Sequence, residues 1–405
     1  MIAEKLEKNI KKAVSKKFSV ELDDTALEHP ADILLGDYAT SIAFKLSSML
    51  DKNPKEIADE LAKELNKKKS GEIEKIEPAD PGFVNFFLSR KFFKDSVRNI
   101  IKSGKKWGSS KEFDGKKIIF EYTDPNPFKQ MHVGHLMSNS IGESISRIVE
   151  FSGAEVKRAN YQGDVGLHVA KTLWGLHKLT LDVKIENLGK AYKEGSDAYK
   201  KNDLAQREIN DINKRVYKKS DDIKENYEKG REISLKHFEE IYKKLGTRFD
   251  YYFFESETAG VGKRIVEENF KIGIFEESEE AIIFRGDLYG LHTRVFINFE
   301  GIPTYEAKEL ALSQMKYEEF PYDLSVIVTA EEQKEYFRVV RKAMEFINPE
   351  LAAATQHISH GLMRLPSGKI SSRSGEVPSG EELIQKVTDA ASEKTERGGK
   401  STANR

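Results

Sequence analysis

The segment 117–161 limits the possible folds of this chain more than any other stretch. Residues 117–122 are rich in β-formers and predict a strand, residues 136–152 predict a helix, and residues 155–161 predict a second strand. Two strands joined through a helix form a βαβ unit, in which the strands run parallel. The sequence therefore predicts an α/β domain with a parallel sheet and nucleotide chemistry at the carboxyl edge of its strands.

The turn between the predicted strand and helix, residues 132–135, has the form H-x-G-H. A turn at a helix N-terminus presents backbone N–H groups and the positive end of the helix dipole to phosphate oxygens. Gly134 has no Cβ, so a nucleotide can lie against the backbone there, and the two imidazoles can donate to charge that develops at phosphorus. Asn126 and Lys129 lie just upstream and can reach the same anion. Taken alone, the four residues are more often two histidines on a loop or helix than a site.

Composition excludes several classes of protein. The chain has 405 residues, enough for two or three domains, and its net charge of −1 gives no global preference for nucleic acid. It has no cysteine, which excludes disulfides and cysteine-based zinc sites. The N-terminus lacks the apolar core of a signal peptide, and no run of about 18 apolar residues occurs. We expect a cytoplasmic protein without a membrane partner.

The chain divides into three predicted regions. Residues 1–105 read as a compact α+β domain, residues 116–380 as a catalytic domain with a mainly helical insertion over about 171–275, and residues 381–405 as the start of a helical region ending in a disordered tail. The charged helices of the insertion are interpreted as solvated rather than as a binding surface. Helices are expected at 1–17, 38–51, 54–68 and 331–347, strands at 72–77, 83–88, 281–286, 294–298 and 324–328, and a linker at 102–110.

A second candidate site for phosphate lies at residues 368–375, which read G-K-I-S-S-R-S-G. Two cations and three hydroxyls between glycines can close over a triphosphate and neutralise the leaving pyrophosphate. Alone, such a segment is more often an exposed loop. Its occurrence together with the H-x-G-H turn, more than 200 residues earlier, is what makes a nucleotide site the better interpretation.

The two motifs together resemble those of the class I aminoacyl-tRNA synthetases, and further segments resemble the arginyl-tRNA synthetases. Residues 121–129 (E-Y-T-D-P-N-P-F-K), 160–166 (N-Y-Q-G-D-V-G) and 305–309 (Y-E-A-K-E) are similar to runs of that family. Residues 36–39 (G-D-Y-A) and 81–86 (P-G-F-V-N-F) resemble its N-terminal additional domain. The resemblance covers roughly residues 1–390, too many ordered matches for chance.

This resemblance implies a fold, a reaction and a set of partners. The fold is α/β, a Rossmann-like parallel-sheet catalytic domain with a helical insertion, preceded by a small α+β domain. The reaction is arginine–tRNA ligation: ATP and Mg²⁺ activate L-arginine to arginyl-adenylate, and the arginyl group passes to tRNA-Arg. The chain is expected to act as a monomer.

The resemblance also assigns roles to residues. A planar guanidinium calls for carboxylates and a tyrosine hydroxyl, and the implied arginine-binding residues are Glu121, Asn126, Tyr305, Glu309 and Gln333. The implied catalytic and ATP-binding residues are His132, Gly134, His135, Lys129, Lys369, Ser371, Ser372 and Arg373. Asn85 and Phe86 are expected to face the D-loop of the tRNA, although Phe86 is as readily a core residue. The bland alternative for Glu309 is a charge on a helix surface.

The chain departs from the family pattern at several points. Ser372 replaces the second lysine of K-M-S-K-S, and Lys129 is expected to compensate; Glu309 replaces an aspartate, and Tyr336 stands where many relatives have histidine. Only about 30 residues follow the late loop, so most of the C-terminal anticodon-binding domain is expected to be missing. Two alternatives stay open: a catalytically idle paralogue that binds tRNA or a protein, and another class I synthetase or nucleotidyltransferase.

Overall fold

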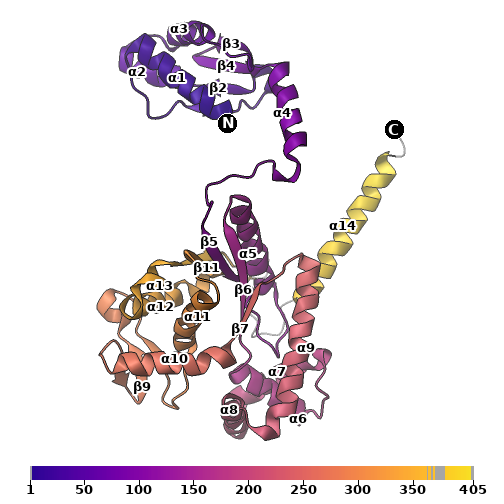
Figure 1. The fold of residues 1–405 in the computed structure, drawn as a ribbon. Coiled ribbons are helices and arrows are strands. Elements are labelled where there is room, and N and C mark those ends of the chain that lie inside the picture. The colour runs from indigo at the N-terminus through magenta and orange to yellow at the C-terminus, as the bar shows by residue number, and fades with distance from the viewer. Residues whose placement is uncertain (1, 363, 366–367, 370–378, 403–405) are drawn as a thin grey trace. The chain divides into compact units, whose positions relative to one another are not determined.

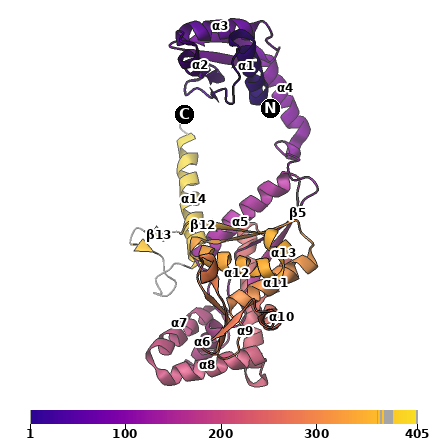
Figure 2. The ribbon, with the colours of Figure 1, turned by 90° about the vertical axis from the view of Figure 1, so that its left-hand side faces the viewer.

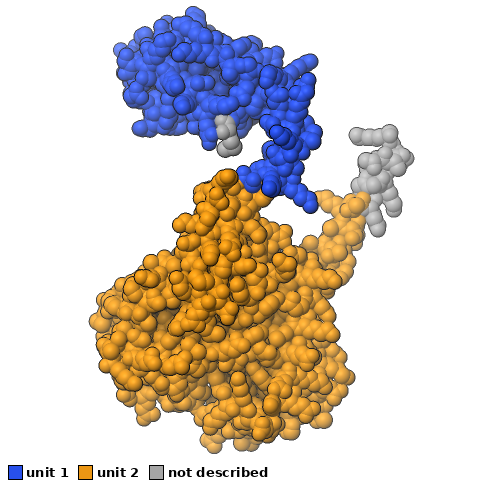
Figure 3. Space-filling view, viewed as in Figure 1, with its two compact units in different colours: residues 1–109 blue, residues 110–405 orange. Residues whose placement is uncertain are grey.

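The computed structural model describes residues 2–362, 364–365, 368–369 and 379–402. The chain forms two compact units, residues 1–109 and residues 110–405 (Figure 3). Each unit buries its own hydrophobic clusters. Within the described ranges, no helix combines the length and the apolarity that a bilayer span requires.

The first unit packs helices against a four-stranded antiparallel sheet of order β1-β2-β4-β3 (Figure 1). Helix α3 begins as the sequence predicts, because Asn53 accepts a hydrogen bond from Lys55 N and Pro54 takes the first helical position. The apolar faces of α1 and α3 bury Leu6 and Leu61 in the core of this unit. Its elements are α1 (Ile2–Phe18), β1 (Leu27–Glu28), η1 (Ile33–Leu35), β2 (Tyr38–Thr40), α2 (Ile42–Leu50), α3 (Pro54–Asn66), β3 (Ile73–Ala79), β4 (Phe83–Leu88) and α4 (Arg90–Ser103).

Two boundaries in this unit differ from the sequence prediction. Residues 38–40 form strand β2 instead of the first turn of a helix, because they pair with β4 and place Tyr38 opposite Phe86. Residues 102–106, predicted as linker, are helical: α4 runs to Ser103 and continues into the 3-10 turn η2 (Gly104–Lys106). The helix extends that far because apolar residues keep helical spacing along it up to Ile101.

The second unit contains a five-stranded parallel sheet of order β12-β11-β5-β6-β7, which confirms the predicted fold class. The strands are β5 (Lys117–Tyr122), β6 (Glu155–Gln162), β7 (Tyr251–Phe254), β11 (Leu324–Ala330) and β12 (Thr355–His360). From β5 the chain proceeds to β6 and β7 on one side, and it later returns to place β11 and β12 on the other. Strand order therefore reverses between β5 and β11, the kind of position where α/β folds bind ligands.

Side chains of β5 alternate between two cores. Ile119 packs with residues of α10 (Glu255–Phe270), α11 (Tyr305–Glu319) and α12 (Lys334–Ile347). Ile118, Phe120 and Tyr122 pack with α5 (Val133–Phe151) and α9 (Asp221–Leu245). Because the period of a strand is two, Glu121 lies on the side of α11.

The helical insertion lies between β6 and β7 in the chain. It consists of α6 (Leu167–Lys178), α7 (Ile185–Lys201), α8 (Asp203–Lys218) and α9, which gather together in both views (Figures 1 and 2). Its helical part ends at Leu245, because β7 then returns to the main sheet. A small antiparallel sheet of β8 (Glu276–Ser278), β9 (Ala281–Phe284) and β10 (Arg294–Ile297) follows α10. The 3-10 turn η3 (Gly286–Tyr289) lies in the connection between β9 and β10.

The C-terminal part of the chain contains a long helix. Helix α14 spans Gly380–Thr402. It is preceded by η4 (Glu331–Gln333), α12, α13 (Pro349–Ala353) and the hairpin of β13 (Arg364–Leu365) and β14 (Gly368–Lys369). Helix α14 includes residues 397–402, for which the predicted disorder stays a prediction. A reciprocal cap starts α14, because Ser379 N donates to Glu382 Oε2 and Glu382 N donates to Ser379 Oγ.

Candidate active site

A cleft of about 720 Å³ lies at the carboxyl edge of the parallel sheet. Its walls come from the loop after β5, the turn after β6, the start of α10 after β7, the end of β11 and the start of α11. The predicted site residues that line it are Glu121, Asn126, Lys129, His132, Gly134, His135, Tyr305, Glu309 and Gln333. Predicted site residues as far apart in the sequence as Glu121 and Gln333 thus line the same cleft.

The backbone fixes the tautomer of both imidazoles in the H-x-G-H turn. His132 Nδ1 accepts a hydrogen bond from Gly134 N and His135 Nδ1 accepts one from His132 N, each at 3.1 Å. A neutral ring that accepts at Nδ1 carries its proton at Nε2. Burial, followed by the charge of Lys129 and the neighbouring imidazole, lowers the pKa of His135 well below its usual value, and burial and Lys129 lower the pKa of His132. Each ring therefore offers a neutral Nε2–H donor.

Gly134 serves the turn in a way that the sequence did not reveal. A Cβ at this position would lie 2.9 Å from His132 Cε1, so the glycine makes room for the histidine ring itself. The two rings stack with their centroids 3.8 Å apart. The hydrogen bonds of the two rings with the backbone cap helix α5. The helix consequently begins at Val133, three residues before the predicted start.

The loop that leads from β5 into this turn is strained. Thr123, Asp124 and Phe128 have φ values of 82°, 47° and 67°, a region that non-glycine residues seldom adopt. Helix α9 of the insertion holds Phe128, whose N donates to Ser234 Oγ at 3.0 Å and whose ring approaches Gly230 so closely that a Cβ there would lie 2.2 Å from Phe128 Cε1. Strain of this kind is typical of functional loops held by their surroundings.

Glu121, one of the residues predicted to bind arginine, forms a buried ion pair with Lys316. Lys316 Nζ lies 2.5 Å from Glu121 Oε2, and both side chains are almost fully buried. Glu309, one to two turns earlier on α11, is 4% exposed, which excludes the helix-surface alternative. Its Oε1 has no hydrogen-bond partner among the described residues, and burial and the charge of Glu121 raise its pKa to about 8. Burial and Glu121 also raise the pKa of Asp124 well above its usual value.

A second buried lysine orders the other side of the cleft. Lys308 Nζ lies 2.6 Å from Glu255 Oε2 and donates to Tyr217 Oη at 2.9 Å, which brings helix α8 of the insertion to the site. Glu255 Oε1 and Asn126 Oδ1 converge over Gly163, where a Cβ would lie 2.9 Å from the former and 2.3 Å from the latter. Two acceptor oxygens thus face one spot, an arrangement suited to an ammonium group.

Several functional residues were missed or undervalued by the sequence prediction. Lys308 and Lys316 lie on α11, and a lysine in a helix is normally assigned to solvent. The available signal was their spacing. Lys308 and Glu309 are neighbours in the sequence, and Lys316 lies seven residues after Glu309, which puts these two on nearly the same face of the helix. Glu255 and Ser256 resemble a family E-S pair near the pocket, a resemblance that was given less weight than the other motifs.

The late loop is only partly within the described residues. Ser371, Ser372 and Arg373 lie outside them, so their predicted roles stay predictions. The backbone of Lys369 pairs with Arg364 in the β13–β14 hairpin. After the loop the chain returns to the H-x-G-H turn, where Gly380 N donates to Met131 O at 2.8 Å and Ser379 forms a β-bridge with His132.

The predicted tRNA contacts of the first unit are buried. Phe86 is fully buried in the core, and Asn85 is 4% exposed. The core alternative therefore fits Phe86, and the predicted role of Asn85 stays a prediction.

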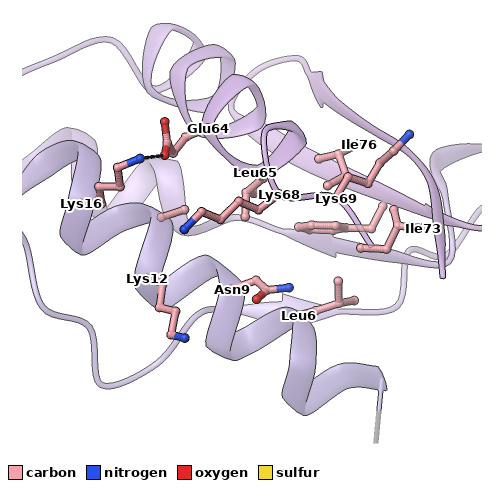
Figure 4. A pocket seen from close by; sticks show the side chains of 12 residues that line it. Leu6, Asn9, Lys12, Lys16, Glu64, Leu65, Lys68, Lys69, Ile73 and Ile76 are labelled. Carbon is pink, nitrogen blue, oxygen red and sulfur yellow. Dashed lines mark hydrogen bonds and ion pairs between the residues drawn. The ribbon is translucent and has the colours of Figure 1, made fainter. Parts of the chain in front are cut away.

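A hollow of about 120 Å³ lies elsewhere in this unit, between α1 and the end of α3 (Figure 4). Lysine side chains surround it, namely Lys12, Lys16, Lys68 and Lys69. Lys16 bonds Glu64 at 2.6 Å, whereas Lys12 and Lys68 have no ion-pair partner in the described part of the chain. The hollow thus carries free cationic groups that can meet phosphate.

Two family descriptions match the chain. The family described as "tRNA synthetases class I (R), catalytic domain" matches residues 96–403. The family described as "Arginyl tRNA synthetase N terminal domain" matches residues 4–88. Together they account for both compact units.

Individual proteins give the same result. The chain is 30% identical over 402 residues to the arginine–tRNA ligase of Clostridium perfringens. The aligned region covers 95% of the chain and 70% of that protein. It is 29% identical over 395 residues to the arginine–tRNA ligase of Clostridium acetobutylicum, covering 95% and 69%. The solved arginyl-tRNA synthetase of Thermus thermophilus superposes with a TM-score of 0.65 at 21% identity, over 96% of the chain and 70% of that structure, which supports the fold.

Proposed function

Since the chain belongs to the class I arginyl-tRNA synthetases and is an arginine–tRNA ligase, we propose that the cleft at the carboxyl edge of its parallel sheet is where arginine is activated with ATP. The observation that carries this assignment is the meeting, in one cleft, of two neutral imidazole donors and the buried carboxyl group of Glu309, whose Oε1 has no hydrogen-bond partner among the described residues. The first group of residues suits a phosphate and the second suits a guanidinium.

In the proposed binding mode, the acidic end of the cleft receives arginine. Glu309 meets the guanidinium with the carboxyl group whose Oε1 has no partner among the described residues, and the half-exposed Tyr305 contributes its hydroxyl. Asn126 and Glu255 receive the α-ammonium group, because their oxygens converge over Gly163. Gln333 also lines the cleft and is assigned to arginine with them. Glu121, already paired with Lys316, is assigned to balancing charge rather than to direct contact.

The other end of the cleft is assigned to ATP. A carboxylate oxygen of arginine attacks the α-phosphorus, the bond to the β-phosphate breaks, and arginyl-adenylate and pyrophosphate form. His132 and His135 donate through Nε2 to the oxygens that gain charge, and Lys129 neutralises the triphosphate, aided by Lys369, Ser371, Ser372 and Arg373 of the late loop. A hydroxyl of the terminal tRNA ribose then takes the arginyl group and releases AMP. Positioning and electrostatics suffice, and no covalent enzyme intermediate is needed.

The expected Mg²⁺ is assigned to the phosphates of ATP. Among the residues that the structure describes, no three histidine, aspartate or glutamate side chains are grouped as metal ligands. The described residues therefore offer no grouped ligand set for a resident metal. We further propose that the chain acts as a monomer in the cytoplasm, as the family resemblance implies.

The proposal is tested by charging tRNA-Arg with labelled arginine, beside lysine and glutamine as controls. Replacing His132 by alanine removes one donor to developing charge, so the rate of arginine-dependent pyrophosphate exchange should fall by roughly 10²–10³. The protein is assayed with tRNA present. Full exchange activity in His132→Ala would contradict the assignment, and failure of the unaltered chain to charge tRNA would favour the idle alternative.

A further inference from the structure

Lys129 is the cation that the proposed function places on the triphosphate, and its side chain is held by the insertion. Its Nζ lies 4.6 Å from the ring centroid of Tyr192 on α7. No carboxylate in the described residues forms an ion pair with it. Although burial acts to raise the pKa of Tyr192, the charge of Lys129 beside the phenol brings that pKa below its usual value. The ammonium therefore lies close to the ring and also to its hydroxyl.

Helix α7 is fixed against the loop that carries Lys129. Gly189, one turn before Tyr192, faces Gln130, since a Cβ on this glycine would lie 3.1 Å from Gln130 Cδ. Two close approaches hold α7 on α6: a Cβ at Gly175 would lie 2.1 Å from Ala191 O, and a Cβ at Gly195 would lie 2.1 Å from Lys171 O. Helices that meet at backbone distance leave little room to slide.

The backbone beside Lys129 is held by two other helices of the insertion. Phe128 N donates to Ser234 Oγ of α9 at 3.0 Å, and Thr172 Oγ1 of α6 donates to Phe128 O at 3.2 Å. The base of the lysine is thus fixed by α6 and α9, while its tip lies over the ring of Tyr192 on α7. This division of contacts separates the effect of Tyr192 from the effect of the insertion as a whole.

We propose that the aromatic ring of Tyr192 is a positioning group that holds the Lys129 ammonium at the phosphate end of the cleft. This inference rests on the proposed function, in which Lys129 binds the triphosphate. The insertion, interpreted from its sequence as a solvated appendage, then takes part in ATP binding through one ring. The ring does not contact the substrate and acts through the lysine.

The test compares Michaelis constants in pyrophosphate exchange with tRNA present. Replacing Tyr192 by leucine should raise the KM for ATP about 3- to 30-fold, the range of a cation–π contact, and leave the KM for arginine unchanged. Tyr192→Phe keeps the ring and should stay within about twofold of the unaltered protein. Tyr192→Met fills similar space without a ring and repeats the test if the leucine variant does not fold.

Helix α7 also offers a matched control. Lys171 Nζ lies 4.4 Å from the ring of Tyr199, the same arrangement outside the cleft. Tyr199→Leu should therefore leave the KM for ATP unchanged. An equal rise in Tyr199→Leu, or a parallel rise in the KM for arginine, would mean that the insertion was merely loosened and would overturn the proposal.

A double-mutant cycle links the effect to Lys129. In a Lys129→Met background, Tyr192→Leu should cause no further rise in the KM for ATP. Additive effects would overturn the positioning role. If Lys129→Met itself leaves ATP use intact, the proposed function of Lys129 fails, an outcome distinct from the failure of Tyr192 alone.

Discussion

At the scale of single residues, Glu309 makes the sharpest prediction about pH. Burial and the charge of Glu121 raise its pKa to about 8, so the free protein holds a proton there at neutral pH. A guanidinium binds the ionised form, so arginine binding must expel that proton. Below pH 8 the apparent affinity for arginine should rise about tenfold per pH unit, and it should level off above pH 8.

Calorimetry in buffers of different ionisation heat measures the proton released. About one proton should leave per arginine at pH 7, and the number released should fall as the pH rises to 8. Glu309→Gln binds arginine more weakly, and its affinity should not vary over this range. Binding that is independent of pH in the unaltered protein would show that Glu309 is not the group that meets the guanidinium.

The two lysines assigned to ATP should differ in importance. Lys129 lines the cleft. Because Ser372 stands where the motif has its second lysine, we expect Lys129→Ala to harm ATP use more than Lys369→Ala. The KM for ATP and kcat of both variants, measured side by side, decide the matter; a larger loss in Lys369→Ala would reverse the assignment.

At the scale of elements, the turn after β6 depends on a glycine. A Cβ at Gly163 would lie 2.3 Å from Asn126 Oδ1 and 2.9 Å from Glu255 Oε1. Gly163→Ala should push both acceptors apart, raise the KM for arginine by roughly tenfold or more, and destabilise the fold by about 1–3 kcal/mol. The KM for ATP should change far less. Gly260→Ala on α10, where a Cβ meets open space, is the matched control; equal effects in both variants would refute the role of the turn.

The sequence predicted elements well where local pattern decides structure. Strands β5 and β4 were predicted at their observed bounds because runs of β-formers define them. Helix α5 starts three residues early because two histidine side chains cap it, a use of histidine that propensity does not anticipate. Strand β2 was missed because pairing with β4 overrides the helical pattern of its residues.

The site was predicted less evenly than the fold. The candidate residues between Glu121 and Gln333 that the motifs indicated line one cleft, and their roles stay predictions. The buried ion pairs could not be predicted. Lys316 and Glu121 are 195 residues apart, and nothing in their local sequence indicates that they meet. The burial of Lys308 was hidden for the same reason, since its partners Glu255 and Tyr217 lie on other helices.

At the scale of the whole molecule, each layer of the second unit contributes residues to the candidate site. The sheet aligns the ends of β5, β6, β7 and β11 at one edge. Helices on one face carry the carboxylates and buried lysines, and α5 on the other face carries the imidazoles. The insertion contributes tyrosines from α7 and α8 to Lys129 and Lys308. A charged surface and a functional inner face thus coexist in one helical segment.

The first unit should contribute to tRNA affinity through the lysines around its hollow rather than through Phe86. Lys12 on α1 and Lys68 after α3 have no described ion-pair partner and are free to meet phosphate. Replacing both by alanine should weaken tRNA binding, leave the KM for arginine and ATP unchanged, and reduce the slope of log affinity against log salt by about 2. Lys8→Ala with Lys63→Ala removes the same charge from α1 and α3, at positions outside the hollow. Salt titrations of tRNA binding for the two double variants give the answer: identical slopes would mean that overall charge, and not this hollow, attracts the tRNA.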